Sequence, residues 1–506
     1  MPIINSIVSW LNVKRMYNID LFRQYPFNVQ EETFNKLIER SKDTEWGKKY
    51  AYSEIKTISK FQSRVPLQTY EEIKPFVERL RKGDQNLLWP TEIKWFAKSS
   101  GTTNDKSKFI PVSFETLEDC HFRGAKDIVA INNNNFPDSR ILKGKALTLG
   151  GSHQINDFNN SSYYGDLSAI LIDNLPFWVT FIRTPSAKIS LLHEWEEKLE
   201  KLMQHTVNEN VTSVAGVPSW MLVLFKSILN YTGKKNILEV WPNLELFIHG
   251  GVSFIPYREQ FLKLIPSPKM KYLETYNASE GFFAIQDDPA TDDMLLMLDY
   301  GIFYEFIPLE NINDENPPVF TVKDVEKNKN YAIVISTNSG LWRYIIGDTI
   351  YFTSLFPHKI KISGRTKHFL NVFGEEVIID NAEKALLTAC SNTGAIITEY
   401  TAGPVFMADN VKGCHEWVIE FEKTPLNIDL FKTELDTALK NLNSDYEAKR
   451  YKDITLGPPI INFVKKNTFY KWLQKKGKLG GQNKVPRLSN ERKILEELLE
   501  IDKNLQ

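Results

Sequence analysis

The chain has 506 residues, of which 42% are hydrophobic and 25% are charged, the balance of an ordinary globular protein. This length exceeds what one hydrophobic core usually organises, so we expect a large domain and a smaller one. The formal net charge is -1, with 62 basic and 63 acidic residues, so no overall field draws the protein to nucleic acid or to an anionic membrane. Composition therefore favours a small-molecule partner, with no nucleic acid and no membrane.

The cysteines and the N-terminus indicate the compartment. Cys120, Cys390 and Cys414 lie far apart and show no metal-ligand spacing, which predicts neither a disulfide framework nor a zinc site. Residues 1–21 mix apolar residues with Asn, Lys and Arg, unlike the unbroken apolar core of a secretory signal. No run of roughly 18 apolar residues occurs. We therefore expect a cytoplasmic protein.

Helical and strand patterns alternate along the chain, which predicts the α/β class. Helical spacing predicts a helix between Thr69 and Gly83, and Pro75 inside it suggests that the regular helix begins only there. Short apolar runs predict buried strands at residues 92–98, 146–149, 211–215, 244–249, 271–275 and 331–337.

Two of these strands precede a glycine or proline turn and an amphipathic helix, at residues 221–229 and 257–265. This order is the βα unit, whose strand ends carry ligand sites in open sheets. Residues 294–309 are rich in Leu, Phe and Tyr without helix caps, which predicts antiparallel strands.

The pattern changes near residues 363–367. Glycine-rich turns dominate before this point, and a compact α+β pattern follows it. The predicted elements are helices at 381–389 and 429–442, a strand at 416–421, and a final helix at 489–499 capped by its serine. We therefore divide the chain into an N-terminal domain, residues 1–363, and a C-terminal domain, residues 364–506.

Residues 99–108, SSGTTNDKSK, follow a predicted strand and combine hydroxyl side chains, one glycine and two lysines. Such a loop suits a polyphosphate, because backbone N–H and hydroxyl groups donate to phosphate oxygens and lysines neutralise charge. It is not a Walker A loop, since no glycine precedes Lys106 at the required place. On this loop alone, a polar surface turn explains the sequence equally well.

Two later segments carry the same kind of chemistry. Residues 276–281, YNASEG, place a ring and a carboxylate at a predicted strand end, as a base and the Mg2+ that accompanies ATP require. Residues 340–348, GLWRYIIGD, end in an Asp after glycine, and an Asp at a turn can accept hydrogen bonds from both ribose hydroxyls. Singly, a buried Tyr, a helix cap and a turn Asp would explain these segments.

The order of the motifs is specific. It resembles the adenylate-forming superfamily and, within it, the Gretchen Hagen 3 family of acyl-acid amido synthetases. The motifs that carry the resemblance are SSGTT, KSKFIPVS, HGGVSFIPYREQF, YNASEGFF, YEFIP, GLWRYIIGD, GRTKHFLNVFGEEV and GGQNKVPRLS, between residues 99 and 489. The resemblance implies a large N-terminal domain of β-sheets flanked by helices and a smaller, mobile α+β C-terminal domain.

The resemblance also implies ATP and Mg2+. Residues expected at the ATP or AMP site are Ser99, Ser100, Gly101, Thr102, Thr103, Lys106, Lys108, Tyr276, Ser279, Asp348 and Arg365. Tyr276 matches the adenine-stacking position, Asp348 the ribose ligand, and Arg365 an arginine that reaches ribose or phosphate. The expected catalytic residues are Glu280, the magnesium-associated acid, and Lys484, a lysine that swings over the α-phosphate.

The acyl group needs a separate pocket. Val217, Trp220, His249 and Gly250 are candidates because they follow predicted strands. Burial in the core explains Trp220 equally well, and a single His at a strand end, such as His249, is more often a hydrogen-bonded structural residue.

The sequence therefore predicts an ATP-dependent ligase. It would activate a carboxylic acid as the acyl-adenylate and transfer it to an amine, with an amino acid as the expected acceptor. A ligase that passes the acyl group to coenzyme A, and a non-catalytic nucleotide sensor, remain as alternatives.

Overall fold

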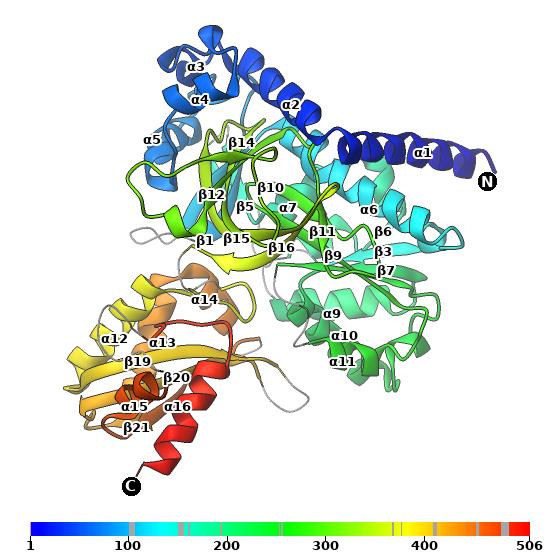
Figure 1. Cartoon of the computed structure of the whole chain (residues 1–506). Helices are drawn as coiled ribbons and strands as arrows, with labels where there is room; N and C mark the ends of the chain where they lie inside the picture. The colour runs from blue at the N-terminus through cyan, green and yellow to red at the C-terminus, as the bar shows by residue number, and fades with distance from the viewer. Residues whose placement is uncertain are drawn as a thin grey trace.

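The structure is a computed structural model of the chain. It describes residues 2–100, 107–149, 156–159, 162–192, 195–251, 254, 257–366, 369–375, 377–407, 412–451, 455–476 and 485–505. Figure 1 shows a large N-terminal part of sheets and helices, and a smaller C-terminal part, yellow to red, of helices packed on one sheet. The predicted fold class is therefore confirmed.

A twelve-stranded sheet forms the centre of the large part, in the order β13-β12-β14-β15-β16-β11-β10-β9-β8-β7-β3-β6. Its strands are β3 (Lys145–Thr148), β6 (Arg183–Thr184), β7 (Val211–Ala215), β8 (Leu246–Gly250), β9 (Lys271–Ala278), β10 (Gly281–Ile285), β11 (Met294–Leu296), β12 (Ile302–Pro308), β13 (Phe320–Thr321), β14 (Asn330–Thr337), β15 (Tyr344–Leu355) and β16 (His358–Arg365). Strands β6, β3, β7, β8 and β9 pair in parallel, and the other pairs are antiparallel. The carboxyl ends of the parallel strands therefore meet at one edge.

A second, four-stranded sheet has the order β2-β1-β5-β4. Its strands are β1 (Trp95–Ser100), β2 (Ser107–Val112), β4 (Asn156–Asn159) and β5 (Ser162–Gly165). The helices of the large part are α1 (Pro2–Gln24), α2 (Pro26–Ser41), α3 (Glu45–Lys49), α4 (Ile58–Arg64), α5 (Tyr70–Arg81), α6 (Phe122–Asn135), α7 (Leu167–Asp173), α8 (Ala187–Ser190), α9 (Trp195–Thr206), α10 (Pro218–Thr232) and α11 (Arg258–Leu264).

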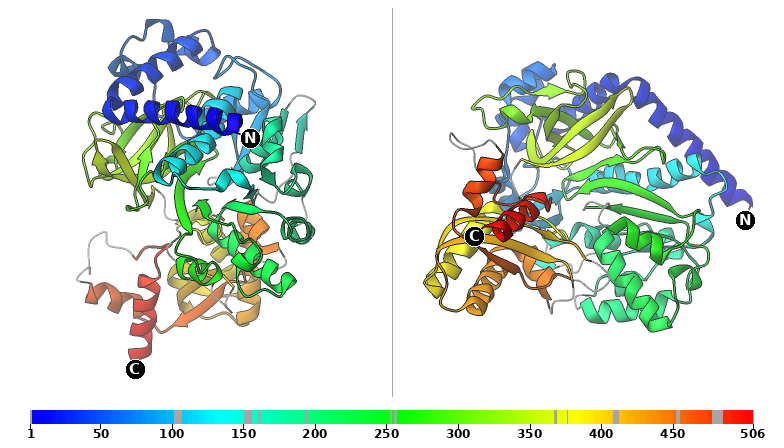
Figure 2. Two further views of the ribbon diagram at one scale, coloured as in Figure 1. Left: turned by 90° about the vertical axis from the view of Figure 1, so that its right-hand side faces the viewer. Right: turned by 60° about the horizontal axis from the view of Figure 1, so that its bottom comes forward.

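The C-terminal part has its own sheet, in the order β19-β20-β21, and a two-stranded ribbon, β17-β18. Its elements are β17 (Phe369–Leu370), β18 (Val377–Ile378), α12 (Ile379–Thr393), β19 (Ile396–Val405), β20 (Cys414–Lys423), α13 (Ile428–Leu442), α14 (Ser444–Arg450), β21 (Ile460–Val464), α15 (Thr468–Lys475) and α16 (Lys493–Asn504). Figure 2 shows this part beside the segment that carries α10 and α11.

Apolar packing joins the two parts. One buried cluster contains residues of α10 and α11 together with Val372 and other residues of the C-terminal part. The buried hydroxyl of Tyr257 donates to the Val372 carbonyl at 2.9 Å, and the Gln260 side-chain amide donates to the Met407 carbonyl at 2.6 Å. Helices α10 and α11 thus pack against the C-terminal part.

Most predicted elements appear, with three corrections. Helix α5 begins at Tyr70, not at Pro75, because Thr69 and Glu72 form a capping box that starts the helix one turn earlier. The last helix, α16, begins at Lys493, because the Ser489 hydroxyl instead accepts from the Glu491 N–H in a local turn. Asp348 lies within strand β15 and not in a turn.

The division at residues 363 and 364 stays a prediction, and β16 of the large sheet runs on to Arg365. Among the described residues, no helix is long and apolar enough to cross a membrane.

Candidate active site

A cavity of about 2850 Å3 runs along the parallel strands, from residues at their amino ends, such as Asn210 and Lys271, to their carboxyl edge. Its lining includes the last residue of each of four of them, namely Thr148, Ala215, Gly250 and Ala278. Residues of β15, β16 and α14 also line it, so both parts of the chain contribute. The carboxyl edge is where open α/β sheets bind ligands.

The predicted phosphate loop connects β1 and β2, which pair in antiparallel register. Ser99 faces Lys108 across the pair and lines the cavity. The Lys108 ammonium lies 5.9 Å from the centre of the Tyr70 ring and acts electrostatically on Glu280. The backbone of Ser100 pairs with that of Ser107, while Gly101, Thr102, Thr103 and Lys106 lie outside the described residues.

Glu280 lies in the short turn of the hairpin that connects β9 and β10. Ala278 of β9 pairs with Gly281 of β10, so Ser279 and Glu280 form a two-residue turn. Glu280 is 6% exposed and lines the cavity. Burial raises its pKa above the usual range, Lys108 opposes this shift, and the charge of Asp348 adds to it. The turn thus holds a carboxylate beside a cation and a second carboxylate.

Tyr276, Asp348 and Arg365 form one hydrogen-bonded group. Asp348 of β15 lies opposite Arg365 of β16, and its Oδ1 accepts from the Arg365 Nε at 2.6 Å. The Tyr276 hydroxyl donates to the other carboxylate oxygen, also at 2.6 Å. The Tyr276 ring is 5% exposed and lies 4.8 Å from the ring of Phe283. The structure therefore brings three predicted nucleotide residues together.

Tyr344 lies near Glu280 and Asp348, and it is not among the site residues that the sequence predicts. Its hydroxyl is buried without a hydrogen-bond partner among the described residues. Burial raises its pKa well above the ordinary value, with Glu280 the next contribution. The signal was present in the sequence, because Tyr344 directly follows the arginine of the GLWRYIIGD motif.

That arginine, Arg343, has a structural role. It is buried, and its guanidinium pairs with the buried Glu305 of β12 at 3.0 Å. It also donates to the backbone carbonyls of Gln62 and Val65. Arg343 of the GLWRYIIGD motif and Glu305 of the YEFIP motif thus stabilise the sheet below the site.

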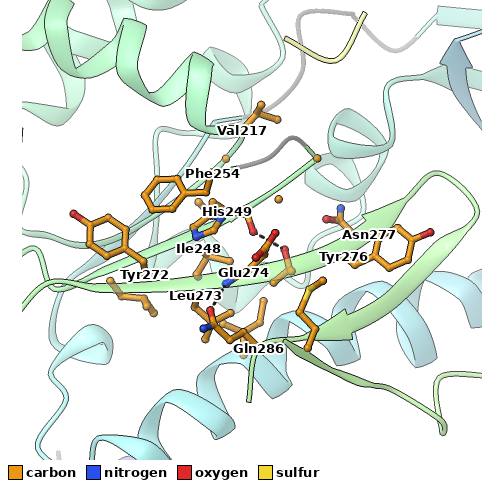
Figure 3. Close-up of a pocket in the computed structure, with 18 of the residues that line it drawn as sticks. Val217, Ile248, His249, Phe254, Tyr272, Leu273, Glu274, Tyr276, Asn277 and Gln286 are labelled. Atoms are coloured by element: carbon orange, nitrogen blue, oxygen red, sulfur yellow. Dashed lines mark hydrogen bonds between the residues drawn. The ribbon is translucent and has the colours of Figure 1, made fainter. Parts of the chain in front are cut away.

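The acyl candidates line the same cavity. Figure 3 shows the rings of His249, Phe254 and Tyr272 together beside the strands, with Tyr276 farther along β9. His249 stacks on Phe254 at 4.2 Å, and burial lowers the pKa of its imidazole to about 3, so the ring is neutral at physiological pH. The Tyr272 hydroxyl and the His249 Nδ1 are buried without partners among the described residues.

Gly250, Val217 and Trp220 occupy distinct places around this aromatic group. Gly250 is needed for the close approach of β8 to β9, because a Cβ there would lie 2.4 Å from the Thr275 carbonyl oxygen. Val217 precedes α10 and lines the cavity. Trp220 also lines it, with its ring 6.4 Å from the ring of Phe373. Trp220 therefore faces the C-terminal part and is not a core residue.

The described side chains of the site could hold Mg2+ only together with a phosphate ligand. Among the described residues, no group of three or more His, Cys, Asp or Glu side chains could hold a metal ion. Mg2+ is commonly bound through one or two carboxylates together with substrate phosphates and water. Glu280 offers one such carboxylate inside the cavity.

Three family models match the sequence. The GH3 family N-terminal domain matches residues 15–270, the central domain residues 295–365, and the C-terminal domain residues 380–493. The first alone covers more than half of the chain. The chain belongs to the GH3 family. The predicted resemblance is thereby confirmed.

Two curated relatives of this GH3 chain are plant enzymes. Indole-3-acetic acid-amido synthetase GH3.3 of Arabidopsis thaliana is 23% identical, and the match covers 92% of this chain and 90% of the relative. Jasmonoyl-L-amino acid synthetase JAR6 of Nicotiana attenuata is also 23% identical, over 91% and 90% of the two chains.

Solved structures share the fold. The AtGH3.15 acyl acid amido synthetase in complex with 2,4-DB matches with a TM-score of 0.60 at 18% identity, covering 94% of this chain and 93% of that one. A 2-hydroxyisobutyryl-CoA ligase matches with a TM-score of 0.58 at 11% identity, over 95% and 93% of the two chains. The adenylate-forming fold predicted for this GH3 chain is therefore confirmed.

The structure thus gathers most of the predicted residues of this GH3 chain around one cavity. Ser99, Tyr276, Ser279, Glu280, Asp348 and Arg365 line it, as do all four acyl candidates. Lys484 lies outside the described residues, so its position over the α-phosphate stays a prediction.

Proposed function

We propose that this GH3 protein is an ATP-dependent ligase that joins a carboxylic acid to an amino acid through an acyl-adenylate. The observation that carries the proposal is the convergence of Glu280, Lys108 and the hydrogen-bonded group of Tyr276, Asp348 and Arg365 at the carboxyl edge of the sheet. Each of these groups matches a need of bound ATP, and the chain belongs to a family whose curated members include amido synthetases.

The first half-reaction needs charge stabilisation more than acid–base chemistry. A carboxylate oxygen of the acid attacks the α-phosphorus of ATP, the bond from that phosphorus to the bridging oxygen breaks, and pyrophosphate leaves. Negative charge grows on the phosphoryl oxygens, so positioned cations and N–H donors lower the barrier. Lys108 and Arg365 supply cations beside the cavity, and Lys484 is proposed to supply another.

The nucleotide is proposed to bind at the group formed by Tyr276, Asp348 and Arg365. Asp348 is an acceptor for ribose hydroxyls, and each of its oxygens retains a lone pair after its bond to Tyr276 or Arg365. The Tyr276 ring is the proposed adenine contact. Glu280 would hold Mg2+ against the phosphates, and the ion would neutralise charge on the pyrophosphate as it departs.

The second half-reaction transfers the acyl group. The amine nitrogen attacks the acyl carbon, the bond from that carbon to the AMP oxygen breaks, and one proton leaves the nitrogen. The amine must therefore arrive unprotonated or lose its proton on binding. The candidate nucleotide residues and the aromatic residues of the proposed acyl site line one cavity, which supports binding of both halves of the acyl-adenylate there.

The deciding experiment is pyrophosphate release with ATP and Mg2+ across a panel of carboxylic acids, with and without mixed amino acids. Release that needs an acid and rises with amino acids supports the proposal and identifies both substrates. Thioester formed with coenzyme A, and no amide, would instead assign an acyl-CoA ligase. ATP binding without release for any acid would favour a nucleotide sensor.

A further inference from the structure

One wall of the cavity comes from the C-terminal part of the chain. Asp445 and Lys449 of α14 line it, together with Asn490 and Glu491. Apart from Lys484, the nucleotide candidates and the acyl candidates described above lie on elements of the large part, with Arg365 at the end of β16. The third reactant of the proposed reaction, the amine, needs a place of its own, and the C-terminal wall supplies side chains that neither of the other two reactants uses.

Lys449 is the cation of that wall. It is half-buried, and its ammonium lies 5.0 Å from the centre of the Trp220 ring. Trp220 lies in the first turn of α10, just past the carboxyl end of β7, so Lys449 reaches the edge of the sheet where the site is built. The Lys449 carbonyl accepts from the Leu456 N–H and the Thr455 hydroxyl, which fix this end of α14.

Lys449 has no oppositely charged partner among the described residues. Two other cations of the cavity are paired with carboxylates, Arg365 with Asp348 and Lys361 with Asp292. Lys449 forms no ion pair within the described part of the chain, and its side chain contacts the Trp220 ring. Its contact with Trp220 is to a ring face, so its N–H groups can still donate to a ligand.

We propose that Lys449 binds the carboxylate of the amino acid acceptor. This inference rests on the proposed function and extends it to acceptor selection. A half-buried ammonium without a carboxylate partner attracts an anion more strongly than an exposed one does. A simple amine would leave Lys449 uncompensated, whereas an amino acid brings the missing charge. The C-terminal part therefore selects amino acids over amines of similar size.

The test separates the two half-reactions. Lys449→Met removes the charge and keeps an unbranched apolar stem, and Lys449→Arg restores a cation. Acid-dependent exchange of labelled pyrophosphate into ATP reports adenylation. Hydroxamate formation with hydroxylamine reports acyl transfer to a nucleophile without a carboxylate. Amide formation is then followed as a function of amino acid concentration, and with the amino acid carboxamide. Lys466→Met, an exposed lysine of the same part of the chain, is the matched control.

We expect Lys449→Met to raise the KM for the amino acid about ten- to hundred-fold, the effect of losing a hydrogen bond to a charged group. Pyrophosphate exchange and hydroxamate formation should stay at the wild-type rates, and the preference for the amino acid over its carboxamide should disappear. Lys449→Arg should recover much of the KM, and Lys466→Met should behave as wild type.

Three results would overturn the proposal. If the KM of Lys449→Met for the amino acid is unchanged while exchange is normal, Lys449 does not bind the acceptor. If exchange and hydroxamate formation fall together with amide formation, the contact with Trp220 is structural. If the wild type shows no acid-dependent exchange, the proposed function fails, and the acceptor assignment fails with it.

Discussion

Asp348 uses both of its carboxylate oxygens within the protein, one for Tyr276 and one for Arg365. The two partners come from different strands, and each bond is 2.6 Å long. The group is therefore held in place before any nucleotide arrives, which lowers the entropy lost on binding. Its geometry depends on one carboxylate, because neither Tyr276 nor Arg365 is bonded to the other in the described structure.

Asp348→Asn tests this dependence. The asparagine side chain has an NH2 group in place of one carboxylate oxygen, so it can accept from only one of the two donors, Tyr276 and Arg365. One hydrogen bond is lost, and the Arg365 guanidinium loses its charged partner. We expect the KM for ATP to rise about ten- to hundred-fold, while the melting temperature changes little. ATP dependence of pyrophosphate release measures the effect, with Asp173→Asn on the exposed end of α7 as the control. An unchanged KM for ATP would show that Asp348 does not contribute to nucleotide binding.

Glu280 is a buried carboxyl whose pKa is raised, chiefly by burial. A carboxyl with a higher pKa in the folded than in the unfolded state destabilises the fold at pH values above its folded pKa. That penalty disappears as the pH falls below the unfolded value of about 4.3. Glu280 is thus expected to be retained for function at a cost in stability.

Glu280→Gln should therefore raise the melting temperature at pH 7.5 while acid-dependent pyrophosphate release falls. The gain in melting temperature should shrink between pH 7.5 and pH 4.5, since the wild type loses its penalty as Glu280 becomes protonated. Thermal melts at the two pH values measure this difference. A lower melting temperature for Glu280→Gln at pH 7.5 would contradict the role of burial.

At the scale of elements, local patterns predicted most of the strands. The run at 211–215 is strand β7 as predicted, and 244–249 overlaps β8. The hydrophobic pattern works here because these strands are buried on both faces, which gives continuous apolar runs. The predicted start of α5 is too late, because proline favours the first position of a helix and Pro75 was placed there. The capping box that starts the helix lies earlier in the sequence. The predicted start of α16 is too early, because the Ser489 hydroxyl accepts a hydrogen bond in a local turn and does not cap the helix.

Gly250 links β8 to β9 at the site, and its exchange tests the packing of this element pair. In Gly250→Ala the new Cβ would lie 2.4 Å from the backbone oxygen of Thr275, so the two strands must separate. We expect the free energy of unfolding to fall by about 1–3 kcal/mol, as for other overpacked positions. Denaturant unfolding measures this, with Gly457→Ala as the control, because there the nearest atom is 3.5 Å away. Equal effects at the two positions would refute the packing argument.

At the scale of the whole molecule, sequence order predicted a large and a small part but not how they meet. The contacts of α10 and α11 with the C-terminal part join residues more than a hundred positions apart, as in the bond from Tyr257 to Val372. No local pattern records such a pairing. The same reason explains why the sequence did not predict Lys449, since its neighbour in space, Trp220, comes from another element.

Tyr257→Phe tests the junction between the two parts. The change leaves the buried Val372 carbonyl without its donor, a loss of about 1–3 kcal/mol. Because that carbonyl belongs to the C-terminal part, we expect faster amide hydrogen exchange across residues 369–375 and little change in β7 or β14. Mass spectrometry of exchanged peptides measures this. Tyr231→Phe, an exposed tyrosine of α10, is the control. Uniformly faster exchange would indicate general destabilisation instead.

The two-residue turn between β9 and β10 also limits where this chain tolerates added sequence. One extra residue at Ser279 would displace Glu280 and reverse the side-chain alternation of the buried strand β10. The exposed segment at 313–316 carries no such constraint, because it connects strands at the surface. An epitope or fluorescent tag therefore belongs at 313–316, whereas the length of the β9–β10 turn is fixed by the acid that it presents.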